Sequence, residues 1–281
     1  MRFLRARACA LPAAVTSFLL PLVLHAGAAL WLGPPPPKDI TRVVTIAPSL
    51  TETVLALDAK ALLVGVSRFD DAAEVKALPR VGGFVDPSIE TVLSLSPHLV
   101  VVQKAPGNQK PIEKLAALGV TVLALPLTTV ADAQDAMLEL GRVLKREARA
   151  KALVDELVTA RARERARVSK ATTKVLFVYG FSPLVVAGPG SFADELLADC
   201  GVTNIVKRAP TSYPVWSMEQ LVAAPPEVLV DASDTADGRD AVRALVPKSR
   251  WVPLENKDLL HPGPALARAL EPLCASLRGK E

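Results

Sequence analysis

A pattern that occurs twice in the sequence, with every position displaced by 129 residues, is the strongest constraint on the fold. Each copy begins with a serine, an apolar residue and a glutamate, and continues through a proline into an apolar run. A serine before a helix and a glutamate in its first turn are both helix-start signals. The matching residues are Ser88, Ile89, Glu90, Leu93, Pro97, Leu99, Val100 and Val101 in the first copy, and Ser217, Met218, Glu219, Val222, Pro226, Val228, Leu229 and Val230 in the second. The repeat predicts two lobes of the same architecture.

The segment between the two copies, residues 146–171, contains neither proline nor glycine and is rich in strong helix formers. Its residues Leu153, Leu157, Ala160 and Val168 fall on or near one helical face. The segment predicts a single long helix. An ordinary crossover helix of one sheet would look similar, but the repeat on both sides favours a helix that links two lobes.

Short apolar strands alternate with helical stretches on both sides of this linking helix. Strands are predicted at residues 42–47, 63–67, 99–103 and 120–125, and again at 174–179 and 228–230. Strands that alternate with helices are typical of parallel α/β sheets. The predicted fold class is therefore α/β, with two parallel-sheet lobes, residues 40–145 and 172–281, joined by one long backbone helix.

Residues 1–33 have the pattern of a targeting segment. Three arginines precede the apolar run Ala10–Leu32, and Ala26–Ala29 offer small residues for cleavage. We therefore expect a signal peptide and export to the periplasm. Because the run is just long enough to span a bilayer, an uncleaved N-terminal anchor that tethers the protein to the inner membrane is the alternative.

The charge balance argues against a nucleic-acid partner. The net charge of +4 includes the three arginines of the targeting segment, which leaves 30 Lys and Arg against 29 Asp and Glu. A nucleic-acid binder needs a basic surface that such a balance does not supply.

Two cysteines, Cys200 and Cys274, lie in the exported part of the chain, whereas Cys9 precedes the apolar run. Two cysteines in an oxidising compartment more often pair than not. We expect a disulfide, and two buried free thiols are the alternative.

The sequence contains no recognisable catalytic constellation. It has no dinucleotide or P-loop pattern and no G-x-S-x-G motif, and only His98 and His261 follow the targeting segment. Two histidines are too few for a histidine-rich metal site. We therefore expect no enzyme activity, no cofactor and no resident metal. His98 is expected to be structural, and His261 is the better candidate to face a cleft.

The first predicted strand leads directly into Pro48, Ser49 and Leu50 at the start of a helix. Ser49 and Glu52 have the spacing of a capping box. A strand that feeds a helix presents free backbone N–H groups at the sheet edge where α/β folds bind ligands. These residues are candidates for a ligand site, although capping alone would explain them.

Several motifs, in this order around the long helix, resemble one known family: RVVTIAPSLTETVLAL, LLVGVSRFDD, GGFVDPSIETVLSLSPHLVVV, SFADELLADCGVTNIV and HPGPALARAL. They are similar to the periplasmic substrate-binding proteins of ABC importers for cobalamin and ferric siderophores. The resemblance runs from Arg42 to about Leu277. It implies the class III binding-protein fold, with the ligand held between two lobes and delivered to the importer's membrane subunits.

The resemblance also implies roles for individual residues. Glu90 and Glu219 match the glutamates that meet arginines of the membrane subunits, although a helix dipole alone would stabilise each glutamate by about 0.3–1 kcal/mol. Cys200 and Cys274 match the disulfide of the cobalamin binders. Gln103 stands where those proteins have a tryptophan. The residues expected to face the ligand are Pro48, Ser49, Leu50, Phe69, Phe84, Gln103, Tyr179, Tyr213 and His261.

The function that we predict from the sequence is capture of a corrinoid, without turnover, by a monomeric binding protein. A ferric siderophore or haem is the alternative ligand. A membrane-anchored sensor with the same fold is a second alternative, and an exported hydrolase is disfavoured because no nucleophile and base can be assigned.

Overall fold

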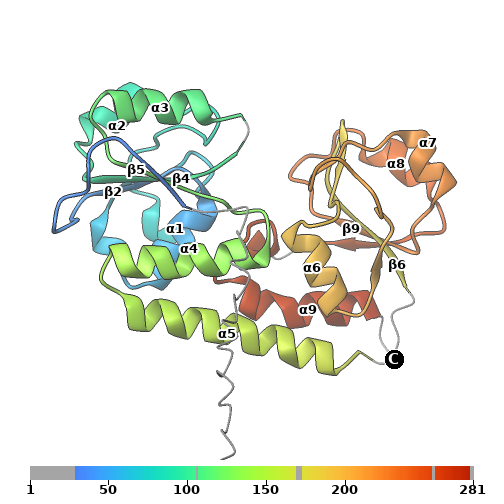
Figure 1. Ribbon diagram of the computed structural model, residues 1–281. Helices are drawn as coiled ribbons and strands as arrows, with labels where there is room; N and C mark the ends of the chain where they lie inside the picture. Colours follow the sequence, from blue (N-terminus) through green and yellow to red (C-terminus); the bar gives the residue numbers. More distant parts are fainter. Residues whose placement is uncertain (1–28, 106, 169–172, 255–256, 279–281) are drawn as a thin grey trace, which may run out of the picture.

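The computed structural model describes residues 29–105, 107–168, 173–254 and 257–278. It contains two α/β lobes with one long helix, α5, running beneath both of them (Figure 1). Each lobe is built on its own sheet of mostly parallel strands. The predicted fold class is confirmed.

The N-terminal lobe has a sheet with the strand order β1-β5-β4-β2-β3. All neighbours pair in parallel except β1, which is antiparallel to β5. The strands are β1 (Leu30–Leu32), β2 (Val43–Thr45), β3 (Leu63–Gly65), β4 (Leu99–Gln103) and β5 (Val122–Leu125). The strand β4 is buried except at its last residue, as expected for a parallel strand with helices on both faces.

Helices cover both faces of this sheet. They are α1 (Pro48–Ala56), α2 (Ile89–Ser94), α3 (Gln109–Ala117) and α4 (Val130–Val143), with short 3-10 turns at Lys60–Leu62 and Ala73–Val75. In Figure 1, α2 and α3 lie above the sheet, and α1 and α4 lie below it, on the side of α5.

The C-terminal lobe repeats this plan with the strand order β10-β9-β6-β7, and β8 also pairs with β6. Its strands are β6 (Lys174–Phe181), β7 (Leu184–Val186), β8 (Thr203–Asn204), β9 (Val228–Asp231) and β10 (Arg250–Pro253). Its helices are α6 (Phe192–Asp199), α7 (Met218–Ala223), α8 (Arg239–Leu245) and α9 (Leu266–Arg278), with a 3-10 turn at Lys257–Leu259.

The sequence repeat is also a structural repeat. The helices α2 and α7 have six residues each, and both their ends and the first residues of β4 and β9 are displaced by the same 129 positions. Ser88 and Ser217 cap the two helices by accepting hydrogen bonds from the third residue after each serine. The residues just before α7 are not helical, and Val215 forms a β-bridge with Val185.

The linking helix α5 spans Glu147–Ala166, which is shorter than the predicted 146–171. Arg167 is its C-cap, and residues 169–172 lie outside the described part of the chain. Its 20 residues span about 30 Å at 1.5 Å per residue. Leu153, Leu157 and Ala160 are buried, so the predicted apolar face is the one that packs.

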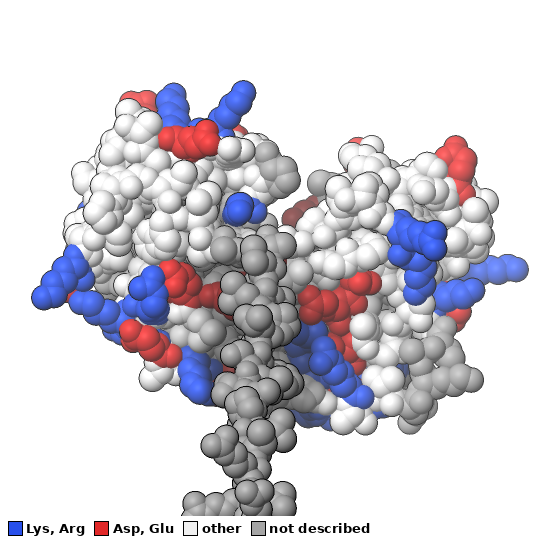
Figure 2. Space-filling model, viewed as in Figure 1, with Lys and Arg blue, Asp and Glu red and all other residues white. Residues whose placement is uncertain are grey.

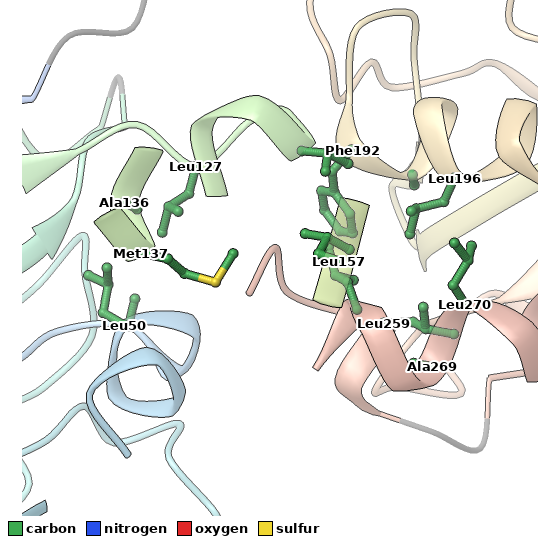
Figure 3. Packing of buried hydrophobic residues seen from close by; sticks show 14 of the residues in the cluster. Leu50, Leu127, Ala136, Met137, Leu157, Phe192, Leu196, Leu259, Ala269 and Leu270 are labelled. Atoms are coloured by element: carbon green, nitrogen blue, oxygen red, sulfur yellow. The ribbon is translucent and has the colours of Figure 1, made fainter. Parts of the chain in front are cut away.

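A single apolar core passes from one lobe to the other beneath the two sheets. In Figure 3, Leu50 and Met137 come from the N-terminal lobe, Leu157 from α5, and Phe192 and Leu270 from the C-terminal lobe. All of them belong to one cluster of buried side chains. Since a large apolar interface opposes separation, the lobes are held as one body. Separate clusters fill the outer face of each sheet.

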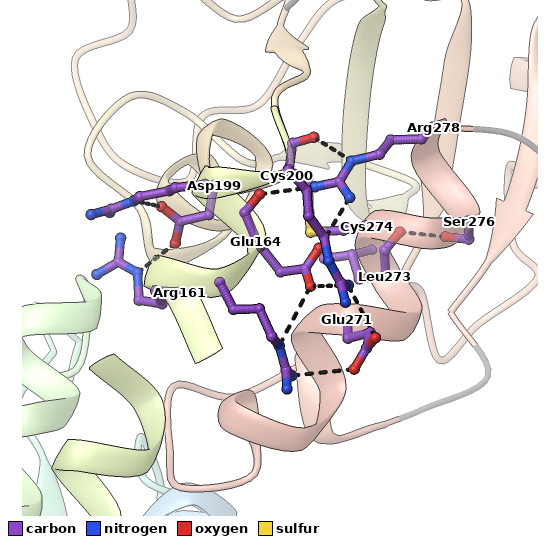
Figure 4. Close-up of a disulfide and its surroundings, with 12 residues drawn as sticks. Arg161, Glu164, Asp199, Cys200, Glu271, Leu273, Cys274, Ser276 and Arg278 are labelled. Atoms are coloured by element: carbon purple, nitrogen blue, oxygen red, sulfur yellow. Dashed lines mark hydrogen bonds and ion pairs between the residues drawn. A yellow bond between two sulfur atoms is a disulfide. The ribbon is translucent and has the colours of Figure 1, made fainter. Parts of the chain in front are cut away.

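A buried carboxylate fixes the C-terminal end of α5 against α9 (Figure 4). Glu164 is 1% exposed and lies 2.7 Å from the guanidinium of Arg167 and 3.1 Å from that of Arg278. Arg278 also donates a hydrogen bond to the carbonyl oxygen of Cys200, next to the Cys200–Cys274 disulfide that the structure contains. Breaking a buried ion pair by removing one partner typically costs about 3–5 kcal/mol, so this arrangement fixes the packing of α5 on α9.

A second buried carboxylate joins α5 to α6. Asp199 is 1% exposed and forms ion pairs with Arg161 and Arg165 of α5. Arg161 also lies 2.9 Å from Glu195 on α6. The arginine-rich face of α5 is therefore occupied in part by contacts within the protein.

The described fold begins earlier than the sequence indicates. Leu30–Leu32, which fall inside the predicted targeting segment 1–33, form the edge strand β1. Trp31 packs against the shared core and donates a hydrogen bond to Glu139. The hydroxyl of Thr121 donates to the carbonyl oxygen of Pro34. Cleavage at Ala26–Ala29, as the sequence predicts, would keep β1 in the mature protein.

We predict that a chain starting at Pro34 is less stable than one starting at Ala29. Losing β1 removes the half-buried Trp31 and the partner of β5, and burial of one large side chain is worth about 1.5–3 kcal/mol. Urea unfolding of both chains, together with Trp31→Ala in the longer one, should show a loss of about 1–2 kcal/mol for the point variant and more for the truncation. Equal midpoints for the two chains would contradict a structural role for β1.

Candidate functional site

The candidate site lies between the two lobes. Figure 2 shows a hollow that separates them and opens on the side of the molecule away from α5. The N-terminal lobe faces this hollow with segments that follow β2, β3 and β5, which is the carboxyl edge of its sheet. Ligands of open α/β sheets bind at that edge.

Hydrogen bonds between the lobes form the floor of the cleft. The backbone N–H of Phe192 donates to the carbonyl oxygen of Thr128 at 2.7 Å. The N–H of Val130 donates to the carboxylate of Glu195 at 3.1 Å. These bonds occupy the N-terminal ends of α6 and α4, so the floor is formed before any ligand binds.

Glu52 makes a third connection across the floor. Its Oε1 atom accepts a hydrogen bond from the backbone N–H of Ala265 at 2.6 Å, just before α9. Gly263 permits this approach, since a Cβ atom there would lie 3.1 Å from the Glu52 carboxylate. Burial raises the pKa of Glu52 to about 7, although the Ala265 N–H and Arg268 lower it.

The predicted capping box of Ser49 and Glu52 is therefore wrong. The N-cap of α1 is Ala47, Pro48 is in its first turn, and no side chain caps the helix. Glu52 reaches the other lobe instead of its own helix start. Pro48 sets the helix start because a proline is well accommodated at the first helical position.

Two tyrosines form the aromatic wall of the C-terminal lobe. Tyr213 lies edge-on to Tyr179 with ring centroids 5.5 Å apart. Tyr179 also contacts Phe177 and Phe192, at 5.0 and 6.4 Å. Tyr213 is 38% exposed, whereas the hydroxyl of Tyr179 is buried and has no hydrogen-bond partner among the described residues.

The loop that carries Tyr213 is held along β7. Gly188 donates to the carbonyl oxygen of Ser212, and Val186 donates to that of Pro214. A Cβ atom at Gly188 would come within 2.7 Å of the Pro214 ring, so this close approach requires glycine. The pairing places Tyr213 above Tyr179.

Both phenols are kept protonated at neutral pH. Burial raises the pKa of Tyr179 well above its usual value, and the neighbouring Tyr213 raises it further. Burial, together with the negative charge of Asp132 on α4, raises the pKa of Tyr213 to about 12. The wall therefore offers aromatic surface and, at Tyr213, a neutral hydroxyl donor.

Phe69 is the exposed aromatic residue of the N-terminal lobe. It is 55% exposed, and the guanidinium of Arg68 lies 5.0 Å from its ring centroid. Arg68 is held by an ion pair with Asp86 at 2.7 Å, and its backbone N–H donates to Gly82. Phe69 is therefore exposed on a segment after β3 that these two contacts hold in place.

The structure distributes the other predicted ligand residues differently. Ser49 and Leu50 are buried, with Leu50 in the shared core, so neither side chain is exposed to the cleft. Phe84 packs against the core on the outer face of the N-terminal sheet.

Pro48, Gln103 and His261 are half-buried, as are Phe84 and Tyr179. Pro48 begins α1, Gln103 ends β4, and His261 lies in the loop before α9. His98, as expected, is structural, and its Nδ1 accepts a hydrogen bond from the N–H of Thr41. Sequence reasoning missed Asp132 and the role of Glu52 across the lobes, because neither contact has a local sequence signal.

A separate cavity of about 440 Å³ lies beside the loop after β4. Leu30 and Leu32 of β1 form part of its lining, which contains both apolar and polar residues. Its lining residues are Leu30, Leu32, Lys104, Ala105, Asn108, Gln109, Ile112, Glu113, Ala124 and Pro126. None of the predicted ligand residues lines it.

Within the ranges that the structure describes, no group of three or more His, Cys, Asp or Glu side chains is placed to hold a metal ion. Over the same ranges, no helix combines the length and the apolar character that a membrane span needs. Most of the predicted targeting segment, residues 1–28, lies outside them.

A model of the family described as periplasmic binding protein matches residues 43–245. This chain belongs to that family. The match covers the strands β2 to β9 of the two sheets and the linking helix, and leaves out the edge strands β1 and β10. The family is a solute-binding class, which agrees with the two-lobed fold and the cleft between the lobes.

Relatives and solved structures support the same assignment. The chain is 28% identical over 247 residues to the vitamin B12-binding protein of Photorhabdus laumondii, which covers 84% of this chain and 87% of the relative. A periplasmic haem-binding protein from Pseudomonas aeruginosa has a TM-score of 0.74 at 26% identity, over 85% of this chain and 92% of that one. The periplasmic vitamin B12-binding protein BtuF of Vibrio cholerae has a TM-score of 0.73 at 23% identity, over 86% and 98%, and shares the fold.

We predict that Glu52→Gln removes a pH dependence of stability. Because the pKa of Glu52 is raised from 4.5 to about 7 in the folded protein, its contribution to stability is fully present below pH 4.5 and is lost as the pH rises through 7. The wild-type protein should therefore lose up to about 3 kcal/mol relative to the glutamine variant across this window. Unfolding titrations at pH 5, 6, 7 and 8 measure the free energy of unfolding of both proteins. If this free energy depends on pH in the same way for both, the prediction is refuted.

Proposed function

We propose that this protein is the substrate-binding component of an ABC importer and that it captures a corrinoid between its lobes without turnover. The observation that carries the choice of ligand is the similarity over most of the chain to vitamin B12-binding proteins. The predicted export signal would place the protein in the periplasm, where it would deliver its ligand to the membrane subunits as a monomer.

The chemistry of the cleft supports a large ligand with amide groups at its rim. Phe69 and Tyr213 offer exposed aromatic surface from opposite lobes, and large apolar faces bind well to such residues. The hydroxyl group of the exposed Tyr213 is a neutral donor that suits amide carbonyls. Coordination of a metal by either phenolate would first have to overcome a raised pKa.

Haem is the second candidate ligand. It is favoured by the similarity to haem-binding structures, including the Pseudomonas aeruginosa protein at 26% identity. A flat ligand of this kind would also use the aromatic faces of Phe69 and Tyr213. A ferric siderophore is the third candidate ligand.

Native mass spectrometry of the purified protein would decide among these ligands. The protein is incubated separately with cyanocobalamin, haem and several ferric siderophores, and the intact complexes are weighed. A stoichiometric complex with cyanocobalamin, recovered unchanged after release, supports corrinoid binding without turnover. A complex with haem or a siderophore alone would reassign the ligand.

We predict that Phe69→Ala and Tyr213→Ala each weaken cyanocobalamin binding by at least about 1 kcal/mol, roughly fivefold in Kd, because each removes an aromatic anchor. Tyr213→Phe should retain most of the affinity if the ring matters more than the hydroxyl. Val158→Ala on α5 is the control, since the exposure of Val158 lies between those of Phe69 and Tyr213 but Val158 is on the linking helix, away from the cleft. Calorimetric titrations that gave unchanged affinities for both alanine variants would show that the pocket lies elsewhere.

We also propose that Glu90 and Glu219 dock the protein on the importer. Both are exposed in the first turns of α2 and α7. These helices lie at the tops of the two lobes, on the same side as the opening of the cleft (Figure 1). Hydrogen bonding with Ser217 lowers the pKa of Glu219, so this carboxylate is charged at neutral pH.

We predict that Glu90→Arg combined with Glu219→Arg abolishes ligand uptake in cells but leaves ligand affinity and melting temperature nearly unchanged. Exposed charges at the rim of an interface act on association rate and salt dependence rather than on the stability of the monomer. Ligand uptake is measured in a strain that lacks the wild-type protein and produces the double variant. Ligand affinity is measured by calorimetry on the purified double variant. Normal uptake, or loss of ligand binding in solution, would return both residues to the role of helix-start charges.

A membrane-anchored sensor with this fold is the remaining alternative. It requires that the apolar segment before Leu30 is retained in the mature protein. Sequencing the N-terminus of the protein recovered from cells tests this directly. A mature chain that begins within residues 27–30 supports cleavage, and an intact N-terminus in the membrane fraction supports the anchor.

A further inference from the structure

The two helices that carry the docking glutamates also carry exposed apolar side chains at matching positions. Leu93 on α2 is 37% exposed, and Val222 on α7 is 54% exposed. Each follows its glutamate by three residues, so the two side chains of each helix lie on the same face. The displacement between Leu93 and Val222 is the same 129 residues that relates Glu90 to Glu219.

The inward faces of these helices account for the remaining apolar residues. Val92 and Leu221 are fully buried, again at matching positions. Ile89 and Met218 are half-buried and pack against the outer core of their own lobe. Folding therefore uses one face of each helix and leaves the face with Glu90 and Leu93, or Glu219 and Val222, directed outward.

A singly exposed valine or leucine is common on protein surfaces and needs no explanation. Here the exposed apolar residue recurs at the equivalent position of both lobes and next to an exposed acid each time. Further exposed apolar residues stand just before each helix, with Val85 at 49% and Val215 at 62% exposure. An acidic and apolar surface of the same design is thus present twice on the face where the cleft opens.

We propose that Leu93 and Val222 are the apolar contacts of two equivalent docking sites. One site consists of Glu90 and Leu93, and the other of Glu219 and Val222. The partner is the pair of importer membrane subunits, which must present a basic group beside an apolar surface twice. This inference rests on the proposed importer function. The charges attract the partner over a distance, and the apolar side chains supply short-range affinity when they are buried.

The test measures binding of fluorescently labelled protein to spheroplasts that overproduce the importer's membrane subunits, with spheroplasts lacking those subunits as background. The variants are Leu93→Gln, Val222→Gln and both together, because glutamine keeps the helix but is polar. Each single change should weaken specific binding about 5- to 30-fold, by similar factors in the two lobes. The dependence of binding on salt should remain that of the wild-type protein, because the charges are intact.

The controls separate this inference from the docking function itself. Leu138→Gln and Val158→Gln alter comparably exposed residues on α4 and α5 and should not change binding. Glu90→Gln with Glu219→Gln should reduce both affinity and salt dependence. If the glutamate variants weaken binding but the apolar variants do not, the two docking sites bind through charge alone and the inference is wrong.

Other outcomes also overturn it. If only one of Leu93→Gln and Val222→Gln weakens specific binding, the two docking sites are not equivalent. If neither the glutamate nor the apolar variants weaken specific binding, the docking function fails together with the inference. A fall in melting temperature for Leu93→Gln and Val222→Gln would show that these two residues stabilise the fold instead of binding a partner.

Discussion

The apolar packing of both lobes onto one face of α5 is the interaction on which the rest of this structure depends. Leu157 stands between side chains of the two lobes, and the core that it joins is continuous from Leu50 to Leu270. Opening the lobes widely would expose this core to water at about 25 cal/mol per Å² of apolar surface. The buried carboxylates Glu164 and Asp199 restrict the alternatives further, because each is satisfied only when α5 lies against α9 and α6.

A shared core of this kind makes the cleft a preformed site. Its floor is already bonded across the lobes, and Tyr213 is already packed on Tyr179 and close to the charge of Asp132. A ligand therefore meets fixed aromatic walls and loses little free energy in ordering them. The buried carboxyl of Glu52 differs from the rest of this floor in one respect, since its raised pKa of about 7 makes its charge change near neutral pH.

The sequence predicted the two-lobed architecture, the linking helix and the equivalence of α2 and α7, because repeats and periodicity are local signals. It did not predict β1, since Leu30–Leu32 continue an apolar run that reads as a targeting segment and only pairing with β5 makes them a strand. The capping pattern of Ser49 and Glu52 was misleading because Pro48 already begins the helix, and the Glu52 partner is 213 residues away. The wall of Tyr179 and Tyr213 came from the resemblance, and its geometry depends on the close approach at Gly188, which no sequence pattern marks.

The same shared core also determines what a partner of this protein can recognise. The helices α2 and α7 sit on different lobes, so the spacing between their outward faces is fixed by side chains such as Leu157 that lie on the far side of the molecule. Two weak contacts held at a fixed distance combine strongly only with a partner whose two sites have the same spacing, and either contact alone remains weak. In the proposed docking, a rigid linker would give selectivity without tight individual contacts, and a small change in the angle between the lobes would weaken attachment. A flexible connection of the same length would lose this selectivity, because it would let the two lobes attach at many spacings.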